Sequence, residues 1–185
     1  MPNYSGMWTL QAQMQARGQE TWTGLPFLYG WGDNAYGQLG QNNRTYRSSP
    51  VQVDSLTTWS QISSTGYNTV ATKTDGTLWG WGYNTFGPVG DNTNINRSSP
   101  VQVGSLTNWN KIHAGNSSTI ATKTAGTLWT WGINGQGGLG LGDIVNRSSP
   151  VQVGSLTTWA NVTQGTYFSI ATKTDGTLWG WGYNP

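Results

Sequence analysis

The sequence predicts an all-β fold, a β-propeller made of four-stranded blades, and three repeated strings support this prediction. RSSPVQV recurs with its proline at Pro50, Pro100 and Pro150, so the repeat is 50 residues long. A string of the form LWGWG and a string ATKTDGT or ATKTAGT recur with the same spacing. A unit of this length buries its apolar face only by stacking on a neighbour. The units span 28–77, 78–127 and 128–177, with a partial fourth unit over 178–185.

Within one repeat, four short strands follow one another. Residues 59–62 and 69–74 are rich in β-prone side chains. Asp75-Gly76 then favours a two-residue type I′ turn, which needs a positive φ at both central positions. Residues 78–81 form the third strand, and 100–103 form the fourth, where the leading proline suits a strand start or an edge. Four strands with no helical periodicity are typical of a propeller blade.

The tryptophans of the third strand indicate how blades stack. Trp79 and Trp81 point to one face, while Gly80 and Gly82 open the other. We expect the bulky face of one blade to pack on the glycine face of the next. Aromatic side chains dominate burial energetics, so seven tryptophans are predicted to be core residues rather than a ligand platform. They are Trp31, Trp79, Trp81, Trp129, Trp131, Trp179 and Trp181.

Two further motifs accompany these strings: GQLG at 37–40, and a W-x-x-I/V-x-x-G segment at 109–115 and 159–165. Together they are similar to the regulator of chromosome condensation repeat, and the resemblance covers 28–185. It implies closed propellers, typically of about seven blades with about 50 residues each. The chromatin-binding member of that family relies on a basic tail. Here Arg17 is the only basic side chain before residue 28, so that role is not expected.

The repeat count predicts an incomplete ring. The chain has three copies of the first, second and fourth strands but four copies of the third. Either two chains close a ring of six or seven blades, or the sequence is a fragment of a longer protein. We favour self-association, and we expect deletion of 178–185 to weaken it, because an open strand edge seeks a partner. The predicted assembly edge consists of Leu28, Trp31, Leu178, Trp179 and Trp181.

Residues 1–27 do not share the repeat. Ser5 is a candidate cap for a short helix that runs to about Ala16, and a loosely ordered leader is the alternative. The string YSGMWTLQAQMQARGQETWTGLP is similar to N-terminal segments of virion structural proteins of tailed phages, marine and cyanobacterial ones included. This resemblance implies a class of protein, the phage particle component, rather than one role.

Composition excludes several classes of function. Charged residues make up 9% of the chain and the net charge is +2 without a basic cluster, so no nucleic-acid partner is expected. No long apolar run predicts a membrane span, and the absence of cysteine excludes disulfides. His113 is the single histidine, so we expect no catalytic site, metal site or cofactor. The loop at 91–94 offers oxygen ligands but lacks the spacing of a calcium loop. Arg47, Arg97 and Arg147 recur once per blade, which indicates a structural contact.

The leading hypothesis from the sequence is a non-enzymatic structural or adhesion module of a phage virion or tail. Its partners would be further copies of the chain and other virion proteins. One alternative is a carbohydrate-binding propeller for host surface glycans, and another is a cytoplasmic protein-interaction propeller. In each case the candidate contacts are aromatic side chains in loops that are not kept in every repeat. They are Tyr36, Tyr67, Phe86 and Tyr167.

Overall fold

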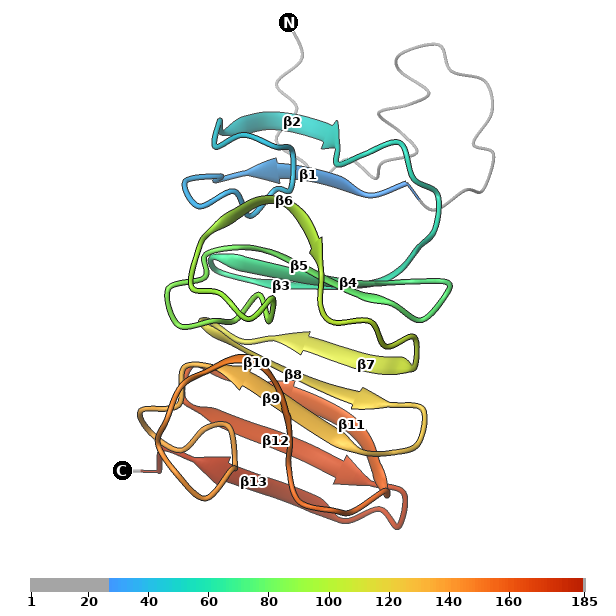
Figure 1. Ribbon diagram of the computed structural model, residues 1–185, viewed down its shortest axis with the longest axis vertical. Helices are drawn as coiled ribbons and strands as arrows, with labels where there is room; N and C mark the ends of the chain where they lie inside the picture. Colours follow the sequence, from blue (N-terminus) through green and yellow to red (C-terminus); the bar gives the residue numbers. More distant parts are fainter. Residues whose placement is uncertain (1–26, 185) are drawn as a thin grey trace, which may run out of the picture.

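A computed structural model describes residues 27–184, and this part of the chain folds into four antiparallel β-sheets (Figure 1). We call the sheets blades I to IV in chain order. Blade I contains β1 (Tyr29–Gly32) and β2 (Arg47–Gln52). Blade II contains β3 (Trp59–Thr65), β4 (Asn68–Lys73), β5 (Leu78–Gly82) and β6 (Arg97–Gln102). Blade III contains β7 (Trp109–Ala114), β8 (Ser118–Lys123), β9 (Leu128–Gly132) and β10 (Arg147–Gln152). Blade IV contains β11 (Trp159–Gln164), β12 (Phe168–Lys173) and β13 (Leu178–Gly182).

The blades are stacked along the long axis of the molecule, with blade I at one end and blade IV at the other (Figure 1). Neighbouring strands in each blade are consecutive in sequence, so every blade is a meander. The all-β, four-stranded architecture is therefore confirmed. Each complete blade takes its first two strands from one repeat and its last two from the next, so consecutive repeats share a sheet. Among the described residues, blade I has only the third and fourth strands and blade IV only the first three.

The hairpin between β4 and β5 differs from the predicted type I′ turn. Gly76 has a φ of 79°, whereas Asp75 is not among the residues with positive φ. Gly76 N donates to Lys73 O at 2.9 Å, and Lys73 N donates to Thr77 O at 3.0 Å. This is a three-residue loop in which a type I turn is followed by a left-handed glycine. The Asp75 carboxylate accepts a hydrogen bond from Thr77 N at 2.9 Å. Asp75 therefore stabilises the turn through its side chain and not, as we expected, by adopting a positive φ.

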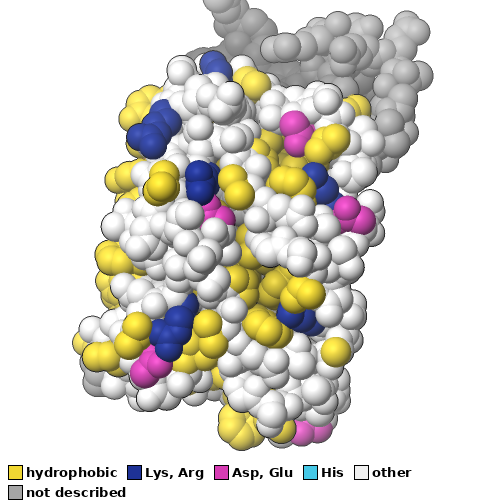
Figure 2. All heavy atoms as spheres, viewed as in Figure 1, with side chains coloured by type: hydrophobic (Ala, Val, Ile, Leu, Met, Phe, Trp, Pro, Cys, Tyr) yellow, Lys and Arg dark blue, Asp and Glu magenta, His cyan; other side chains and the backbone are white. Residues whose placement is uncertain are grey.

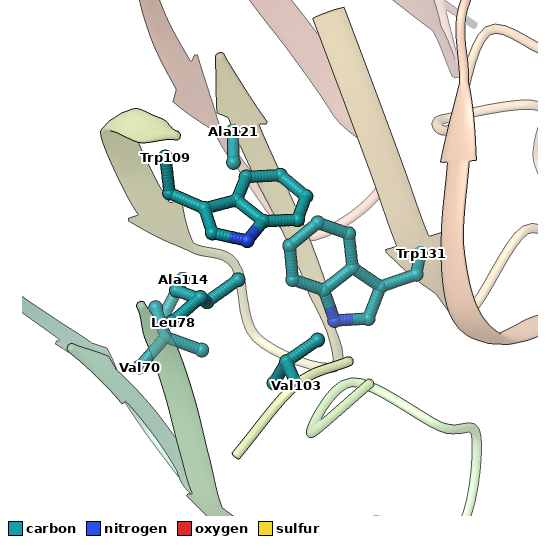
Figure 3. Close-up of a cluster of buried hydrophobic side chains, with 7 residues drawn as sticks. All are labelled: Val70, Leu78, Val103, Trp109, Ala114, Ala121 and Trp131. Carbon is teal, nitrogen blue, oxygen red and sulfur yellow. The ribbon is translucent and has the colours of Figure 1, made fainter. Parts of the chain in front are cut away.

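The apolar core lies between blades rather than within one sheet. Figure 3 shows the core between blades II and III, where Trp109 and Trp131 lie between Val70 and Leu78 of blade II and the strands of blade III. Trp109 and Trp131 pack edge to face with ring centroids 5.9 Å apart. Equivalent clusters join blade I to blade II and blade III to blade IV. Burial of several aromatic side chains at each junction is the main favourable term that holds the stack together.

The expected packing of tryptophans on the strand-three glycines is wrong in its choice of glycine. A Cβ added to Gly80 would lie 2.5 Å from Val89 O, because the loop of its own blade covers that face. The indole of the next blade lies against this loop instead. A Cβ on Gly90 would lie 2.6 Å from Trp131 Nε1. The equivalent glycines of the other two loops make the same contact, Gly40 with Trp81 and Gly140 with Trp181.

The prediction that seven tryptophans are core residues holds for the middle of the stack and fails at its ends. Trp81 and Trp131 are buried, and Trp79, Trp129 and Trp181 are half-buried. Trp31 in blade I and Trp179 in blade IV are exposed to 57% and 48%, because each lies on an outer blade. Across residues 27–184, no helix has the length and apolar character needed to cross a membrane.

Candidate functional site

The loops between the third and fourth strands lie together at one edge of the stack, and each is organised by a buried asparagine. Asn84 is fully buried, and its Oδ1 accepts from Val89 N at 3.0 Å. Its Nδ2 donates to Thr93 O at 3.0 Å and Ile95 O at 3.1 Å. Asn34 and Asn134 make the same kind of contacts one repeat before and after. These amides fix the loop backbone, so the side chains that the loops present are held in place.

Each loop is also fastened to the following blade by a carbonyl that accepts two hydrogen bonds, an arrangement that we call the latch. Pro88 O accepts from Thr119 Oγ1 at 2.8 Å and from Trp131 Nε1 at 2.8 Å. In the preceding junction, Thr69 Oγ1 and Trp81 Nε1 donate to Gln38 O in the same way. In the following junction Ser169 and Trp181 donate to Gly138 O. The latches keep the loop edges of successive blades in one continuous surface.

An aromatic cluster lies on this surface where blades I and II meet. Tyr36 packs edge to face on Tyr67 and on Tyr83, with ring centroids 5.2 Å and 5.1 Å apart. Phe86 continues the cluster at 6.2 Å from Tyr83. Tyr67 is 43% exposed, and the other three are half-buried. Hydrophobic side chains gather along the loop edge of the stack, at the left of Figure 2.

The cluster is particular to one junction and is not part of the repeat. In blade III, the residues at the positions of Tyr67 and Tyr83 are Ser117 and Ile133, and Gln136 takes the place of the loop aromatic. The structure thus brings together three of the four predicted contacts, Tyr36, Tyr67 and Phe86. Tyr167 lies apart in blade IV, where it is 46% exposed.

Tyr83 is the member of the cluster that the sequence analysis missed. It directly follows the LWGWG string, where the other repeats have Asp33, Ile133 and Tyr183. That variation at a fixed repeat position is the signal that could have identified it.

A groove of about 610 Å³ adjoins the cluster on the side of blade I. Tyr36 and Tyr67 line it and are shared with the cluster. β2 and the residues before it also line the groove, and Tyr46 is 68% exposed. The lining is completed by Gly32, Asp33, Ala35, Arg47 and Ser48. The groove therefore offers aromatic faces beside one carboxylate and one guanidinium.

The recurring arginines have the structural contact that their spacing predicted. Arg97 Nε lies 2.6 Å from Asp91 Oδ2, and Arg147 pairs with Asp143 at 2.5 Å. Arg47 Nε instead donates to Gln41 Oε1 at 2.9 Å. Burial acts to raise the pKa of Asp91, but hydrogen bonds from Thr93 and Arg97 outweigh it, so the pKa is lowered. The contact with Arg97 binds the 91–94 loop to its own blade. Among residues 27–184, no group of three or more His, Cys, Asp or Glu side chains is placed to hold a metal ion.

His113 lies between blades III and IV. Its Nδ1 accepts from Gln164 N at 3.1 Å, and its Nε2 lies 3.3 Å from Thr163 Oγ1. Burial lowers its pKa below the ordinary 6.5, which favours the neutral ring that this acceptor role needs. One junction earlier, Ser63 Oγ accepts from Ala114 N at 2.9 Å. His113 is therefore a junction residue in the position of Ser63.

The predicted assembly edge is only partly available. Leu28 is buried in the core that joins blades I and II, so the expectation that it lies at an open edge is wrong. It occupies the place that Leu78 and Leu128 take in the next two junctions. Leu178 is 69% exposed, and Trp31 and Trp179 are exposed as described above. Trp181 is half-buried because its indole forms the latch to Gly138.

Comparisons with known proteins agree with this architecture. A family model described as the regulator of chromosome condensation (RCC1) repeat matches residues 27–72, 75–122 and 125–172, and a second model with the same description matches 59–87. No match was found among curated proteins.

Among solved structures, human WBSCR16 is 23% identical with a TM-score of 0.69, over 84% of this chain and 43% of that chain. Yeast RCC1 (Prp20), in a complex with Kap60, is 20% identical with a TM-score of 0.73, over 85% of this chain and 40% of that chain. A structure of Prp20p from Saccharomyces cerevisiae, described with its binding properties to Gsp1p and histones, is 18% identical with a TM-score of 0.70. It matches over 85% of this chain and 41% of that chain. The chain therefore spans about two fifths of the length of these proteins, and the likeness shows the fold.

Proposed function

Because the chain belongs to the family of regulator of chromosome condensation (RCC1) repeats, we propose that it is a non-enzymatic interaction module that binds a protein partner through the aromatic cluster. The observation that carries the proposal is the concentration of Tyr36, Tyr67, Tyr83 and Phe86 at one junction of the loop edge. Tyrosine and phenylalanine are enriched in the cores of protein interfaces. Rigid aromatic rings offer large contact area at a low cost in side-chain entropy.

The cluster is not needed to build a blade, and this supports a role in binding. Blade III forms the same four strands with serine, isoleucine and glutamine at the equivalent positions. Exposed apolar surface without a structural purpose is typical of interaction sites. One of the similar proteins, yeast Prp20, is described with protein partners in two structures, with Kap60 in one and with Gsp1p and histones in the other. We propose the same class of ligand for this chain, without those particular partners.

The setting that we propose is a phage particle, in which the chain is a structural or adhesion component of the virion or tail. This proposal rests on the resemblance of the first segment, and residues 1–26 lie outside the described part of the chain. Mass spectrometry of purified particles tests it directly. Detection of the chain in stoichiometric amounts would support the proposal. Recovery only from the soluble fraction of infected cells would contradict it and favour a cytoplasmic interaction propeller.

A host surface glycan is the second candidate ligand. The groove beside the cluster combines the faces of Tyr36, Tyr46 and Tyr67 with the polar groups of Asp33 and Arg47. Sugars are bound by such a pairing of apolar rings and directed polar groups. A glycan array with the native chain and the Tyr46→Asn variant tests this candidate. Asparagine is the residue at positions 96 and 146, so the substitution is compatible with a blade. Equal signals from both proteins would exclude the groove.

The repeats themselves provide a matched variant for the test of protein binding. Tyr36→Gln, Tyr67→Ser, Tyr83→Ile and Phe86→Gln together give the first junction the side chains found at 117, 133 and 136. We expect the variant to fold and to lose a partner that the native chain retains from host lysate or disrupted particles. The retained protein is then purified and its affinity measured by calorimetry, with an expected loss of at least about tenfold. Equal binding by native chain and variant would overturn the proposal.

A further inference from the structure

Two places in blade I, which we call vacancies, hold no atoms of residues 27–184, whereas the equivalent places in other blades are filled. The first is in the apolar core. Val70 of β4 and Ile120 of β8 each fill the junction with the following blade. The core between blades I and II has no such residue among 27–184. A cavity of about 190 Å³ lies there instead, lined by Leu28, Gly30, Val53, Ile62 and Trp81, among others. Ile62 is 52% exposed, whereas its equivalents Ile112 and Val162 are half-buried.

The second vacancy is the groove over Ser48. In the next two blades, the equivalent serine receives the loop of the preceding blade. Asn42 N donates to Ser98 O at 2.7 Å, and Asn92 N donates to Ser148 O at 2.8 Å. Ser48 is exposed and lines the 610 Å³ groove, and no preceding loop covers it among the described residues. Both vacancies therefore mark the seat of a preceding blade.

The other end of the same chain carries the matching parts. In blade IV, Ile170 of β12 pairs with Gly180, as Val70 pairs with Gly80 in blade II. Ile170 is thus the next residue in the series of Val70 and Ile120. A Cβ on Gly37 or Gly87 would collide with the serine of the following blade, whereas one on Gly137 would have nothing within 4 Å. The loop of blade III therefore has an open side where a fourth strand with such a serine would lie.

We propose that two copies of this chain join by strand exchange, with β12 of one copy pairing with β1 of the other in place of its own β13. The strands β13 and β1 have nearly the same sequence, LWGWG and LYGWG, and the same position in the repeat. The register would place Ile170 opposite Gly30 and Ala171 opposite Tyr29, since β12 now pairs these residues with Gly180 and Trp179. This inference goes beyond the proposed function, since the exchanged strands contain none of the four aromatic residues of the cluster. A loop over Ser48 would fill the groove that Tyr36 and Tyr67 line, so a glycan in that groove would compete with the exchange.

A single pairing register of β12 with β1 fills both the cavity and the groove, and this agreement is the main support for the proposal. With a shift of 150 residues, Ile170 enters the cavity beside Ile62, and the loop that contains Gly137 covers Ser48. The exposed Trp31 gains an acceptor, because it takes the place from which Trp181 donates to Gly138 O at 3.1 Å. β2 supplies the fourth strand that blade IV lacks among residues 27–184. The exchange is reciprocal, so each copy fills the vacancies of the other.

Native mass spectrometry and light scattering of the full 185-residue chain at micromolar concentration test the assembly. One chain has a mass of 20.0 kDa, so the exchanged dimer has about twice that mass. The exchange reverses the expectation from the sequence for residues 178–185. Their deletion removes the strand that competes with β1, so we expect the dimer fraction to rise. A monomer in both proteins, or a lower dimer fraction after deletion, would overturn the proposal.

Because the chain contains no cysteine, one engineered pair identifies the interface. Tyr29→Cys with Ala171→Cys places the two thiols opposite one another only in the exchanged dimer. Cα atoms of such pairs are about 4.5–5.5 Å apart, which suits a disulfide. We expect a covalent dimer on a non-reducing gel, with each single-cysteine variant as the control. A native dimer whose double variant stays unlinked would show a different interface and overturn the exchange. Equal partner binding by the native chain and the quadruple aromatic variant would overturn the proposed function and leave this result unchanged, so the two proposals fail separately.

Discussion

Blade III and blade I present almost the same third strand to different surroundings. In blade III, Trp131 is fully buried, and its indole donates to Pro88 O of the preceding blade. In blade I, Trp31 occupies the same repeat position and is 57% exposed. Blade III packs on blade II, whereas blade I has no preceding blade among residues 27–184, although a buried asparagine holds the loop of each in the same way. The stack is thus a series of equivalent junctions between blades. The contribution of a residue to the free energy of unfolding depends on how many of these junctions it takes part in.

The largest contrast is expected between Trp131→Ala and Trp31→Ala. The first leaves a cavity in a full junction and removes the latch donor, so it should lower the free energy of unfolding by about 3–5 kcal/mol. The second should change it by less than about 1 kcal/mol in the single chain. Urea unfolding followed by tryptophan fluorescence measures both. In the exchanged dimer, Trp31→Ala acquires a larger cost that depends on protein concentration. Equal losses in dilute protein would break the comparison.

Alanine substitutions at two glycines distinguish the energetic cost of backbone strain from the cost of a packing clash. Gly90 has a φ of 84° and lies against Trp131, whereas Gly142 has a φ of 78° and open space around it. Both alanine variants carry the strain of the left-handed conformation, about 1 kcal/mol. Gly90→Ala adds a clash with a buried indole, so we expect a total of about 3 kcal/mol. Thermal unfolding of the pair gives the difference, and similar melting temperatures would show that the indole moves freely.

The same lysine–tryptophan cation–π contact occurs in the middle of the stack and at its end, where we expect it to stabilise the fold to different extents. Lys123 Nζ lies 3.4 Å from the ring centroid of half-buried Trp129, and Lys173 Nζ lies 3.9 Å from that of exposed Trp179. Burial lowers the pKa of Lys123, which fits a desolvated ammonium. We expect Lys123→Met to cost about 1 kcal/mol and Lys173→Met less than half of that. Urea unfolding in low and high salt measures both losses. A loss at Lys173 equal to that at Lys123 would contradict the dependence on burial.

The smallest effect concerns pH, where Ser63 and His113 occupy the same position in successive junctions. Because the folded pKa of His113 is lowered, the unfolded chain binds the proton more readily. Stability of the junction between blades III and IV is therefore present above about pH 6.5 and is lost as the pH falls. His113→Ser copies the preceding junction and should flatten the melting temperature between pH 7 and 5. Hydrogen exchange at β11 locates the change, and an unaltered pH profile would contradict it.

Much of the fold could be predicted from the sequence because the repeat reports the same physics several times. The strands, their order and the central tryptophans follow from strings that recur every 50 residues. Two predictions were wrong, the type of the turn at Asp75 and the choice of the glycine that contacts the indole of the next blade. Both features depend on contacts between elements that are distant in sequence. A Cβ on Gly76 would lie 2.0 Å from Thr107 O of the next blade, so tertiary packing takes part in fixing that loop. Tyr83 joined the candidate site only in three dimensions, because its partners Tyr36 and Tyr67 come from two blades.

The sharing of each sheet between consecutive repeats has a consequence for descent. A recombination event that duplicates any 50-residue window of such a chain restores the same strand order, wherever the break falls. The duplicated repeat packs against neighbours like those of the original copy, so no new kind of contact between blades is required. Near-identical strings at Pro50, Pro100 and Pro150 are the product expected from recent events of this sort. The length of the array is then free to drift by whole repeats, while side chains such as Tyr67 and Ser117 diverge to give each junction its own task.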